Sequence, residues 1–236
     1  MGMTIDFHSH ILPGVDDGSA TVEESLRMLR LQAEQGVTHV VATPHFYPHH
    51  DSPEAFLKRR LEAENQLRKA MSQETGLPEL IMGAEVYYFS GISDSDILPR
   101  LTIGENRYML IEMPQTPWTE SMYRELEQIW LKWGITPIIA HVDRYISPLR
   151  THHIPERLAK LPVVVQANAN FFLQRSTRSM ALRMLRAGQI HLLGSDCHNM
   201  DSRKPNLGDA ISLIEKRIGS IPVENIRELG RKVLGL

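Results

Sequence analysis

Residues 6–18 read DFHSHILPGVDDG, a stretch in which two histidines stand one residue apart at the end of an apolar run. The residues before His8 are typical of a buried strand, whereas Asp16 and Asp17 lie in a turn bounded by glycines. Alternate residues of a strand point to the same side, so His8 and His10 can reach a common centre while Ser9 points away. The stretch therefore predicts a first strand whose end provides two imidazole ligands to a metal site.

The composition indicates an ordinary globular protein. With 236 residues, 42% of them hydrophobic and 23% charged, the chain suits one domain spanning residues 1–236. A net charge of -2 argues against a basic surface for nucleic acid. Cys197 is the only cysteine, no apolar run approaches the roughly 18 residues of a membrane span, and the first residues lack the features of a secretory signal. We expect a cytoplasmic protein without membrane insertion.

Strand-like and helix-like segments alternate along the chain, as in sheets of parallel strands joined by helices. The predicted strands are 4–8, 39–43, 80–86, 108–112, 136–141, 163–167 and 189–194, and the predicted helices are 21–36, 52–74, 121–133, 177–187, 209–218 and 223–233. A region containing Asp94, Asp96 and Pro99 receives no assignment. The strands are apolar enough to be buried on both faces, which predicts an α/β fold in which seven parallel strands form a barrel.

Six of the seven predicted strands end in, or are soon followed by, a histidine or an acidic residue. In barrels of parallel strands these ends meet at the C-terminal mouth. The candidate metal ligands are His8, His10, Asp17, His45, Glu85, Glu112, His141, Asp196 and His198. Nine ligands exceed what one ion takes, and imidazole and carboxylate without thiolate suit a cluster of Mn, Fe or Zn. A bridging carboxylate such as Glu85 would hold two ions about 3.5 to 4 Å apart, and such clusters activate water for hydrolysis.

Some of these residues have simpler interpretations. Asp17 could only shape the turn beside Asp16, and Glu112 could pair with an arginine. The remaining histidines are interpreted as structural or solvated: His39, His49, His50, His152, His153 and His191.

Arg144 and Arg203 follow two of the candidate ligands and are expected on loops at the same mouth. Guanidinium beside a metal cluster is suited to bidentate binding of phosphate. Each arginine alone could instead pair with a neighbouring aspartate, Asp143 or Asp201. Together they favour a phosphate ester as the substrate.

Residues 197–203, CHNMDSR, fit the C-x5-R pattern of cysteine-dependent tyrosine phosphatases. A loop that binds phosphate through its backbone amides needs small, glycine-rich residues. His198 and Asp201 are bulky or negatively charged, so Cys197 is assigned no catalytic role.

The motifs HSHILPGVDDG, ATPH, GAEVYY, LIEMP, IAHVDRY and GSDCHN resemble the PHP (polymerase and histidinol phosphatase) superfamily, within it the bacterial metal-dependent protein-tyrosine phosphatases of capsule and exopolysaccharide synthesis. The resemblance implies the PHP fold, a distorted (β/α)7 TIM-like barrel, with three divalent metal ions, manganese being favoured over iron or zinc. The implied ligand sets are His8, His10 and Asp196 with Glu85 bridging; Glu85, Glu112 and His141; and Asp17, His45 and His198. Arg144 and Arg203 match the residues that contact phosphate.

Two stretches depart from the pattern of that family. Val142 and Asp143 stand where relatives often carry proline and glutamate, and residues 168–173, NANFFL, are also unusual. We expect neither stretch to contact a ligand, and both to affect only the shape of the substrate groove.

The predicted function is hydrolysis of phosphotyrosine on a protein, which the resemblance implies to be the tail of a bacterial tyrosine kinase that controls polysaccharide export. One alternative is a small-molecule phosphomonoesterase such as a histidinol-phosphate phosphatase. Another is a metal-binding regulator without catalytic activity, although such proteins usually lose ligands and none is missing here.

Overall fold

The computed structural model describes residues 2–146 and 153–236, so His152 lies outside the described residues. The strands are β1 (Ile5–Ser9), β2 (His39–Ala42), β3 (His45–Phe46), β4 (Glu79–Met82), β5 (Glu85–Tyr87), β6 (Tyr108–Glu112), β7 (Thr136–Ile139), β8 (Val164–Asn168) and β9 (Leu192–Gly194). The α-helices are α1 (Val22–Glu34), α2 (Pro53–Met71), α3 (Glu120–Trp133), α4 (Asp143–Ile146), α5 (Ile154–Leu158), α6 (Ala169–Leu173), α7 (Arg178–Arg186), α8 (Leu207–Ile218) and α9 (Ile221–Leu234). The region without a predicted element contains two 3-10 helices, Ile92–Asp94 and Leu98–Arg100.

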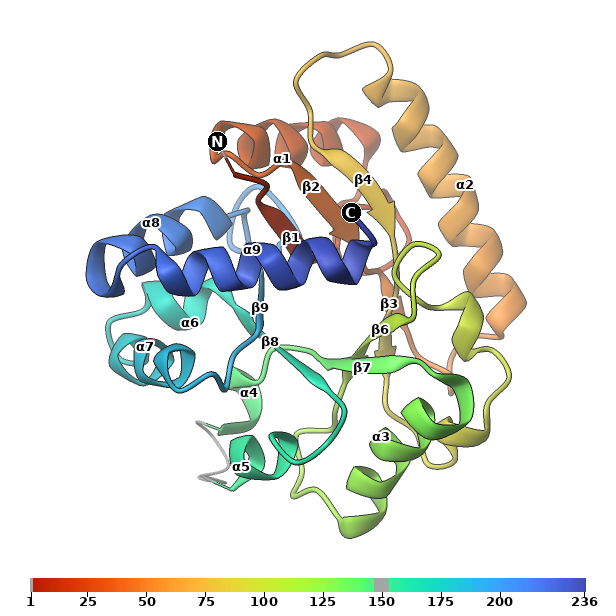
Figure 1. Cartoon of the computed structure of the whole chain (residues 1–236). Helices are drawn as coiled ribbons and strands as arrows, with labels where there is room; N and C mark the ends of the chain where they lie inside the picture. Colours follow the sequence, from red (N-terminus) through yellow and green to blue (C-terminus); the bar gives the residue numbers. More distant parts are fainter. Residues whose placement is uncertain (1, 147–152) are drawn as a thin grey trace.

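Every strand pair is parallel, and the strands follow one another around a curled sheet in chain order (Figure 1). The order is β1-β2-β4 in one part and β3-β5-β6-β7-β8-β9 in the other. Backbone bonds from Gly83 N to Ala42 O and from Glu85 N to Pro44 O continue the pairing of the two chain segments through the gap between the parts. In the part of the chain that the structure describes, nine strands thus occupy seven positions, because β2 with β3 and β4 with β5 each fill one.

The predicted strand 80–86 is therefore wrong in one respect, since it is two short strands rather than one. The neighbouring segment, which forms β2 and β3, is interrupted at Pro44, because proline has no amide hydrogen to donate to a strand ladder. At Gly83 a Cβ atom would lie 3.3 Å from the side chains of Val41 and Ile103, which shows how tightly the chain packs at this break.

The curled sheet closes where the segment after β9 returns to β1. Ser9 forms a parallel bridge with Cys197. The amide of Asp196 donates to His8 O at 2.8 Å, and the amide of His10 donates to Cys197 O at 2.9 Å. This closure gives the predicted α/β barrel of parallel strands.

Two apolar clusters hold the barrel together. The smaller is formed by alternate residues of the strands, among them Phe7, Val41, Leu110 and Leu192, together with the end of α9. Helix α9 runs across the strands in Figure 1. The larger cluster lies between the strands and the surrounding helices. Burying both faces of each strand explains the continuous apolar runs in the sequence.

The helix starts predicted at residues 21 and 52 are present. The hydroxyl of Thr21 accepts from Glu24 N at 3.1 Å, and that of Ser52 accepts from Ala55 N at 3.2 Å. The Glu24 carboxylate accepts from Ala20 N at 3.0 Å, one residue before the position expected for a capping box. The N-termini of α1 and α2 are thus satisfied by side chains.

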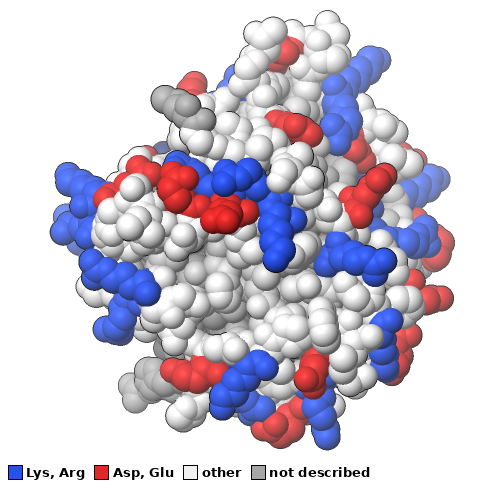
Figure 2. Space-filling model, in the orientation of Figure 1, with Lys and Arg blue, Asp and Glu red and all other residues white. Residues whose placement is uncertain are grey.

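Positive and negative side chains alternate over the face shown in Figure 2, with no continuous basic surface in that view. Within residues 2–146 and 153–236, none of the helices combines the length and the apolar character that a membrane crossing requires.

The packing of α9 against the strands predicts a difference between two leucines near the C-terminus. Leu234 is 8% exposed within the smaller apolar cluster, whereas Leu236 is 62% exposed. We expect Leu234→Ala to lower the free energy of unfolding by about 2 to 4 kcal/mol. The matched change Leu236→Ala should alter it by less than about 0.5 kcal/mol. Urea unfolding of both variants measures the difference, and equal effects would show that α9 does not complete the core.

Candidate metal centre

A β-bulge in β1 turns two histidines toward the mouth of the barrel. Between Asp6 and Ser9, β1 uses one residue more than β2. Such a bulge bends a strand and redirects its side chains. Phe7 consequently belongs to the apolar cluster, while the Nε2 atoms of His8 and His10 lie 3.1 Å apart at the mouth. The Ser9 hydroxyl points away and donates to the backbone of β2 at 2.9 Å, as predicted.

Asp6 stabilises the bulged strand. Its buried carboxylate accepts from His8 N at 3.2 Å, from Ser195 N at 2.8 Å and from the Ser195 hydroxyl at 2.5 Å. Burial raises the pKa of Asp6 to about 6, although the bonds from Ser195 and His8 oppose the shift. Asp6 thus ties β1 to the segment after β9, a role that the sequence did not predict.

The carboxylate of Glu85 lies among four imidazoles. Its Oε2 atom is 3.1 Å from His8 Nε2, 3.3 Å from His10 Nε2 and 3.0 Å from His45 Nδ1, and its Oε1 atom is 2.8 Å from His141 Nε2. The side chain is 1% exposed. Burial by itself would raise the pKa of Glu85, but the surrounding histidines outweigh it and hold this pKa well below its usual range. Candidate ligands thus lie beside both oxygens of Glu85, an arrangement compatible with a carboxylate shared by two cations.

Asp196 is the second carboxylate beside the first two histidines. Its Oδ1 atom lies 3.5 Å from His8 Nε2 and 3.4 Å from His10 Nε2. Oδ1 is also 2.7 Å from Arg203 Nη2, and Oδ2 accepts from Arg144 Nη2. Burial opposes ionisation, yet these cationic neighbours hold the pKa of Asp196 well below its usual range.

Both arginines therefore face the cluster and not the neighbouring aspartates considered above. Arg144 Nη1 also lies 3.8 Å from Glu112 Oε1. We expected both arginines on loops. Arg203 does lie in the loop before α8, but Arg144 belongs to α4. Their side chains are 31% and 37% exposed, so a ligand at the mouth can reach them.

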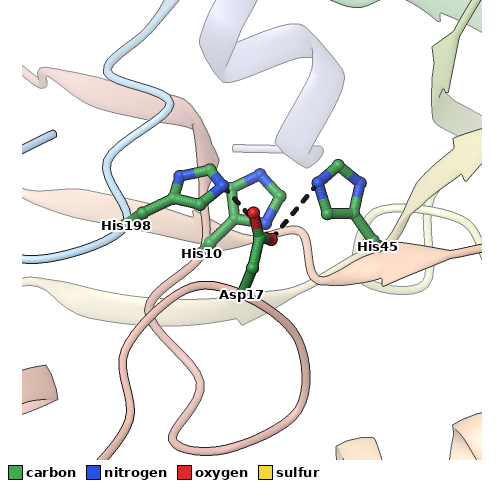
Figure 3. A group of neighbouring side chains, drawn as sticks. All are labelled: His10, Asp17, His45 and His198. Carbon is green, nitrogen blue, oxygen red and sulfur yellow. Dashed lines mark ion pairs between the residues drawn. The ribbon is translucent and has the colours of Figure 1, made fainter.

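Asp17 joins two histidines on the outer side of the cluster (Figure 3). Its Oδ1 atom is 3.6 Å from His45 Nε2 and 3.5 Å from His198 Nε2. His10 lies behind them, with its ring centroid 3.9 Å from that of His198. The side chain of Asp17 is 67% exposed, so this part of the cluster opens to solvent.

Glu112 completes the opposite side. Its carboxylate oxygens lie 3.6 Å from His141 Nε2 and 3.9 Å from His45 Nδ1. Burial and the nearby charge of Glu85 raise the pKa of Glu112. Glu112 therefore pairs with Arg144 and faces the cluster at the same time.

All nine candidate ligands thus lie in one connected cluster at one end of the barrel. Three groups have potential ligand atoms within 4.8 Å of one another: His10, Asp17, His45 and His198; His8, His10 and Glu85; and His45, Glu85 and Glu112. They differ from the three sets implied by the resemblance in three ways. His10 also joins the outer set, Asp196 is absent from the group of His8, His10 and Glu85, and His45 takes the place of His141.

The cluster fits divalent cations. Among the described residues, His45 Nδ1, His141 Nδ1 and His198 Nε2 are buried nitrogen atoms that form no well-aligned hydrogen bond. Carboxylate oxygens nevertheless lie 3.0 Å from His45 Nδ1 and 3.5 Å from His198 Nε2. Buried polar atoms are normally satisfied, so unpaired imidazole nitrogens that face carboxylates favour a bound cation. Oxygen and imidazole donors without thiolate suit Mn, Fe and Zn.

Two of the candidate ligands have unusual backbone conformations. Among the described residues other than glycine, only His141 and Asp196 have positive φ angles, 32° and 53°. This region costs L-residues about 1 to 2 kcal/mol. It is held by bonds from His141 N to Gln166 Oε1 at 2.6 Å and from Asp196 N to the β1 backbone. Backbone strain of this kind is concentrated at functional sites.

Asp16, which was considered only as a residue of the turn, orients two histidines. Its Oδ2 atom is 2.7 Å from His10 Nδ1 and accepts from His45 N at 2.9 Å. Burial would raise the pKa of Asp16, but the bond with His10 prevails and lowers it to about 2. An aspartate that fixes the ring nitrogen remote from the metal is common in metal sites. The signal in the sequence was an acidic residue a few positions after H-x-H.

Gln166 and Asn168 were also missed. Gln166 Oε1 lies 3.4 Å from His8 Nδ1, and Asn168 Nδ2 donates to Asp196 Oδ2 at 2.9 Å. The expectation that residues 168–173 contact no ligand is therefore wrong. Polar residues at alternate positions of the otherwise apolar strand β8 were the available signal.

Cys197 is fully buried, and its sulfur lies 3.5 Å from Gln32 Nε2. Burial raises the pKa of its thiol, which makes the thiolate unfavourable. The structure thus supports the assignment of no catalytic role. Of the other histidines, His49, His50 and His153 are exposed, His39 lies 3.5 Å from Glu79, and His191 Nδ1 accepts from Val165 N at 2.9 Å.

The fold and these side chains define a TIM-like barrel with an imidazole–carboxylate cluster able to bind metal ions. Residues 4–230 match the family described as capsular polysaccharide synthesis, CpsB/CapC. The chain belongs to this family.

Similar proteins agree with this assignment. The tyrosine-protein phosphatase YwqE of Bacillus subtilis is 31% identical over 92% of this chain and 85% of its own. The tyrosine-protein phosphatase CpsB of Streptococcus pneumoniae is 30% identical over 92% of this chain and 91% of its own. A crystal structure from work on these two proteins, described as unique metal-dependent tyrosine phosphatases, superposes with a TM-score of 0.83 and 28% identity over 97% of this chain and 94% of that one.

The contact between Asp16 and His10 predicts an effect on metal binding. Asp16→Asn keeps the shape of the side chain but removes the charge that orients the imidazole, so we expect metal affinity to fall about 10- to 100-fold. Competition with a chelator measures the affinity. Asp201→Asn, at an exposed aspartate of the loop before α8, is the matched control. Equal affinity in the two variants would contradict the role of Asp16.

Proposed function

We propose that this chain is a metal-dependent protein-tyrosine phosphatase that acts on a phosphotyrosine-bearing protein in capsule synthesis. The observation that carries the proposal is the gathering of nine imidazole and carboxylate side chains with two guanidinium groups at one mouth of the barrel. The names of the similar proteins, and the metal dependence stated for the similar structure, support it.

We further propose three divalent ions, with manganese favoured over iron or zinc. The residues that would hold them are His8, His10, Asp17, His45, Glu85, Glu112, His141, Asp196 and His198. When bound, such ions make water nucleophilic near neutral pH and neutralise charge on phosphoryl oxygens. The spread of the ligands over three overlapping groups, two of which share Glu85, supports more than one ion.

The two arginines would bind the phosphate. Arg144 contacts one carboxylate oxygen of Asp196, and Arg203 contacts the other. These contacts hold both guanidinium groups at the mouth before any substrate arrives. Planar guanidinium groups match phosphate oxygens in bidentate geometry. They would stabilise the negative charge that collects on the equatorial oxygens during in-line displacement. No protein nucleophile is needed, in agreement with the burial of Cys197.

The substrate we propose is the phosphorylated tail of a bacterial tyrosine kinase that controls polysaccharide export. The family description places the chain in capsular polysaccharide synthesis. An extended tail could present its phosphate to the partly exposed arginines at the mouth.

Metal dependence can be tested at Glu85. We expect Glu85→Gln to reduce hydrolysis of a phosphotyrosine peptide on the order of a hundredfold or more, because ligands of catalytic metals contribute several kcal/mol to transition-state stabilisation. The bound metal, measured by elemental analysis, should fall as well. EDTA should abolish activity of the unaltered protein, and manganese should restore it.

The matched control is Glu79→Gln, since Glu79 is 70% exposed and lies at the start of β4, away from the cluster. It should retain both metal and activity. Peptide hydrolysis that persists in EDTA, with the metal shown to be removed, would refute the proposed function.

The C-x5-R sequence can be tested at Cys197. Cys197→Ala should keep peptide hydrolysis within about threefold, because the buried thiol touches no reacting group and its loss costs only packing. Iodoacetamide should not inactivate the folded protein. A loss of several orders of magnitude in a variant that still folds and binds metal would indicate cysteine-dependent catalysis instead.

A further inference from the structure

Two tyrosines, Tyr47 and Tyr87, lie next to the metal-binding cluster. In β3 and β5, His45 pairs in register with Glu85, so Tyr47 and Tyr87 follow each of them by two residues. Side chains two apart on a strand point to the same side and lie about 6.6 Å further along it. Tyr47 immediately follows β3 and Tyr87 ends β5, where it is in register with the candidate ligand Glu112. Both tyrosines thus follow a candidate ligand by two residues in the direction of the barrel mouth.

The two rings form a continuous surface against the cluster. Tyr47 stacks on the His45 imidazole, with ring centroids 4.9 Å apart and an interplanar angle of 28°. The ring of Tyr87 lies 5.6 Å from that of Tyr47 at 48°, and Tyr87 is in register with Glu112 on β6. Both tyrosines are partly exposed. An aromatic surface beside a polar, charged centre thus remains accessible to a ligand.

The depth of the cluster sets a minimum length for the group that links the phosphate of a substrate to its peptide backbone. His8 and His10 are 0% exposed and Glu85 is 1% exposed, whereas Arg144 and Arg203 are 31% and 37% exposed. A phosphoryl group that reaches from the cluster to both arginines therefore lies deeper in the mouth than the ring of its ester. In a phenyl phosphate the ring is attached directly to the ester oxygen and would lie at the level of Tyr47 and Tyr87. An alkyl ester such as phosphoserine would present only a methylene group there, and its peptide backbone would have to enter the mouth.

We propose that Tyr47 and Tyr87 form an aryl-binding wall that selects phosphate esters of phenols over those of aliphatic alcohols. The inference rests on the proposed phosphatase function and specifies its substrate class. Offset or tilted contacts between aromatic rings favour the phenyl ring of such an ester over a flexible chain. The two tyrosines are specificity residues, and the phosphoryl chemistry belongs to the cluster beneath them.

The test compares two substrates in each variant. The ratio of kcat/KM for a phosphotyrosine peptide to that for the same peptide with phosphoserine is measured with manganese. We expect Tyr47→Leu and Tyr87→Leu each to lower this ratio about tenfold, and Tyr47→Phe, which keeps the ring, to lower it by less than about twofold. Trp130→Leu, at a tryptophan 44% exposed on α3, is the control for loss of an aromatic residue and should keep the ratio.

A binding measurement provides a readout that does not depend on turnover. Calorimetry with phenylphosphonate and ethylphosphonate, neither of which is hydrolysed, should show an aryl preference that Tyr47→Leu and Tyr87→Leu reduce. Circular dichroism and metal content establish that each variant is folded and loaded.

The outcomes separate the two proposals. If the unaltered protein hydrolyses phosphate esters but the ratio is the same in the leucine variants, the aryl-binding wall is refuted and the phosphatase function stands. If Tyr47→Phe loses as much selectivity as Tyr47→Leu, the hydroxyl and not the ring is responsible, and the wall is again refuted. If the unaltered, metal-loaded protein hydrolyses neither peptide, the phosphatase function fails and the inference fails with it.

Discussion

Backbone pairing between β1 and the segment after β9 is the interaction on which the whole cluster depends. It joins opposite ends of the chain through the bonds from Asp196 N to His8 O and from His10 N to Cys197 O. The contact leaves no space for a side chain at Gly194, where a Cβ atom would lie 2.5 Å from the Cβ of His8. Barrel closure therefore also brings candidate ligands together, because two of the segments that carry them are the ones that close the sheet.

Burying the carboxylates of the cluster carries a desolvation cost, which neighbouring imidazole and guanidinium groups offset. Buried charges are unfavourable unless they are paired. The charged partners of Glu85 and Asp196 are imidazoles and guanidinium groups, and Asn168 also donates to Asp196. Three imidazole nitrogens of the cluster form no hydrogen bond among the described residues. The positive φ angles of His141 and Asp196 add a further backbone cost. The imidazole nitrogens without hydrogen bonds and the strained backbone are understandable if bound cations supply further stabilisation.

The sequence predicted the barrel and the convergence of the candidate ligands because both follow from strand periodicity and from parallel topology. It could not show that the third strand is broken at Gly83, since the apolar pattern continues across the break. The roles of Asp16 and Gln166 were equally hidden, because each is defined by a partner that only the fold brings near: His45 N for Asp16 and His8 for Gln166. Residues that contact other residues of the site, rather than a ligand, leave weak local signals.

The interior of the barrel changes character along each strand, and this change links stability to function. At one end, alternate residues such as Val41, Leu110 and Val164 form the apolar cluster that α9 covers. Further along, the same side of the strands carries polar residues, with Glu112 following Leu110 by two positions in β6. In β1 this periodicity alone would place Ser9 after Phe7, and the bulge brings in the histidines instead. The candidate metal centre is thus built as the next layer of the core, so the packing that stabilises the barrel also fixes the positions of the candidate ligands.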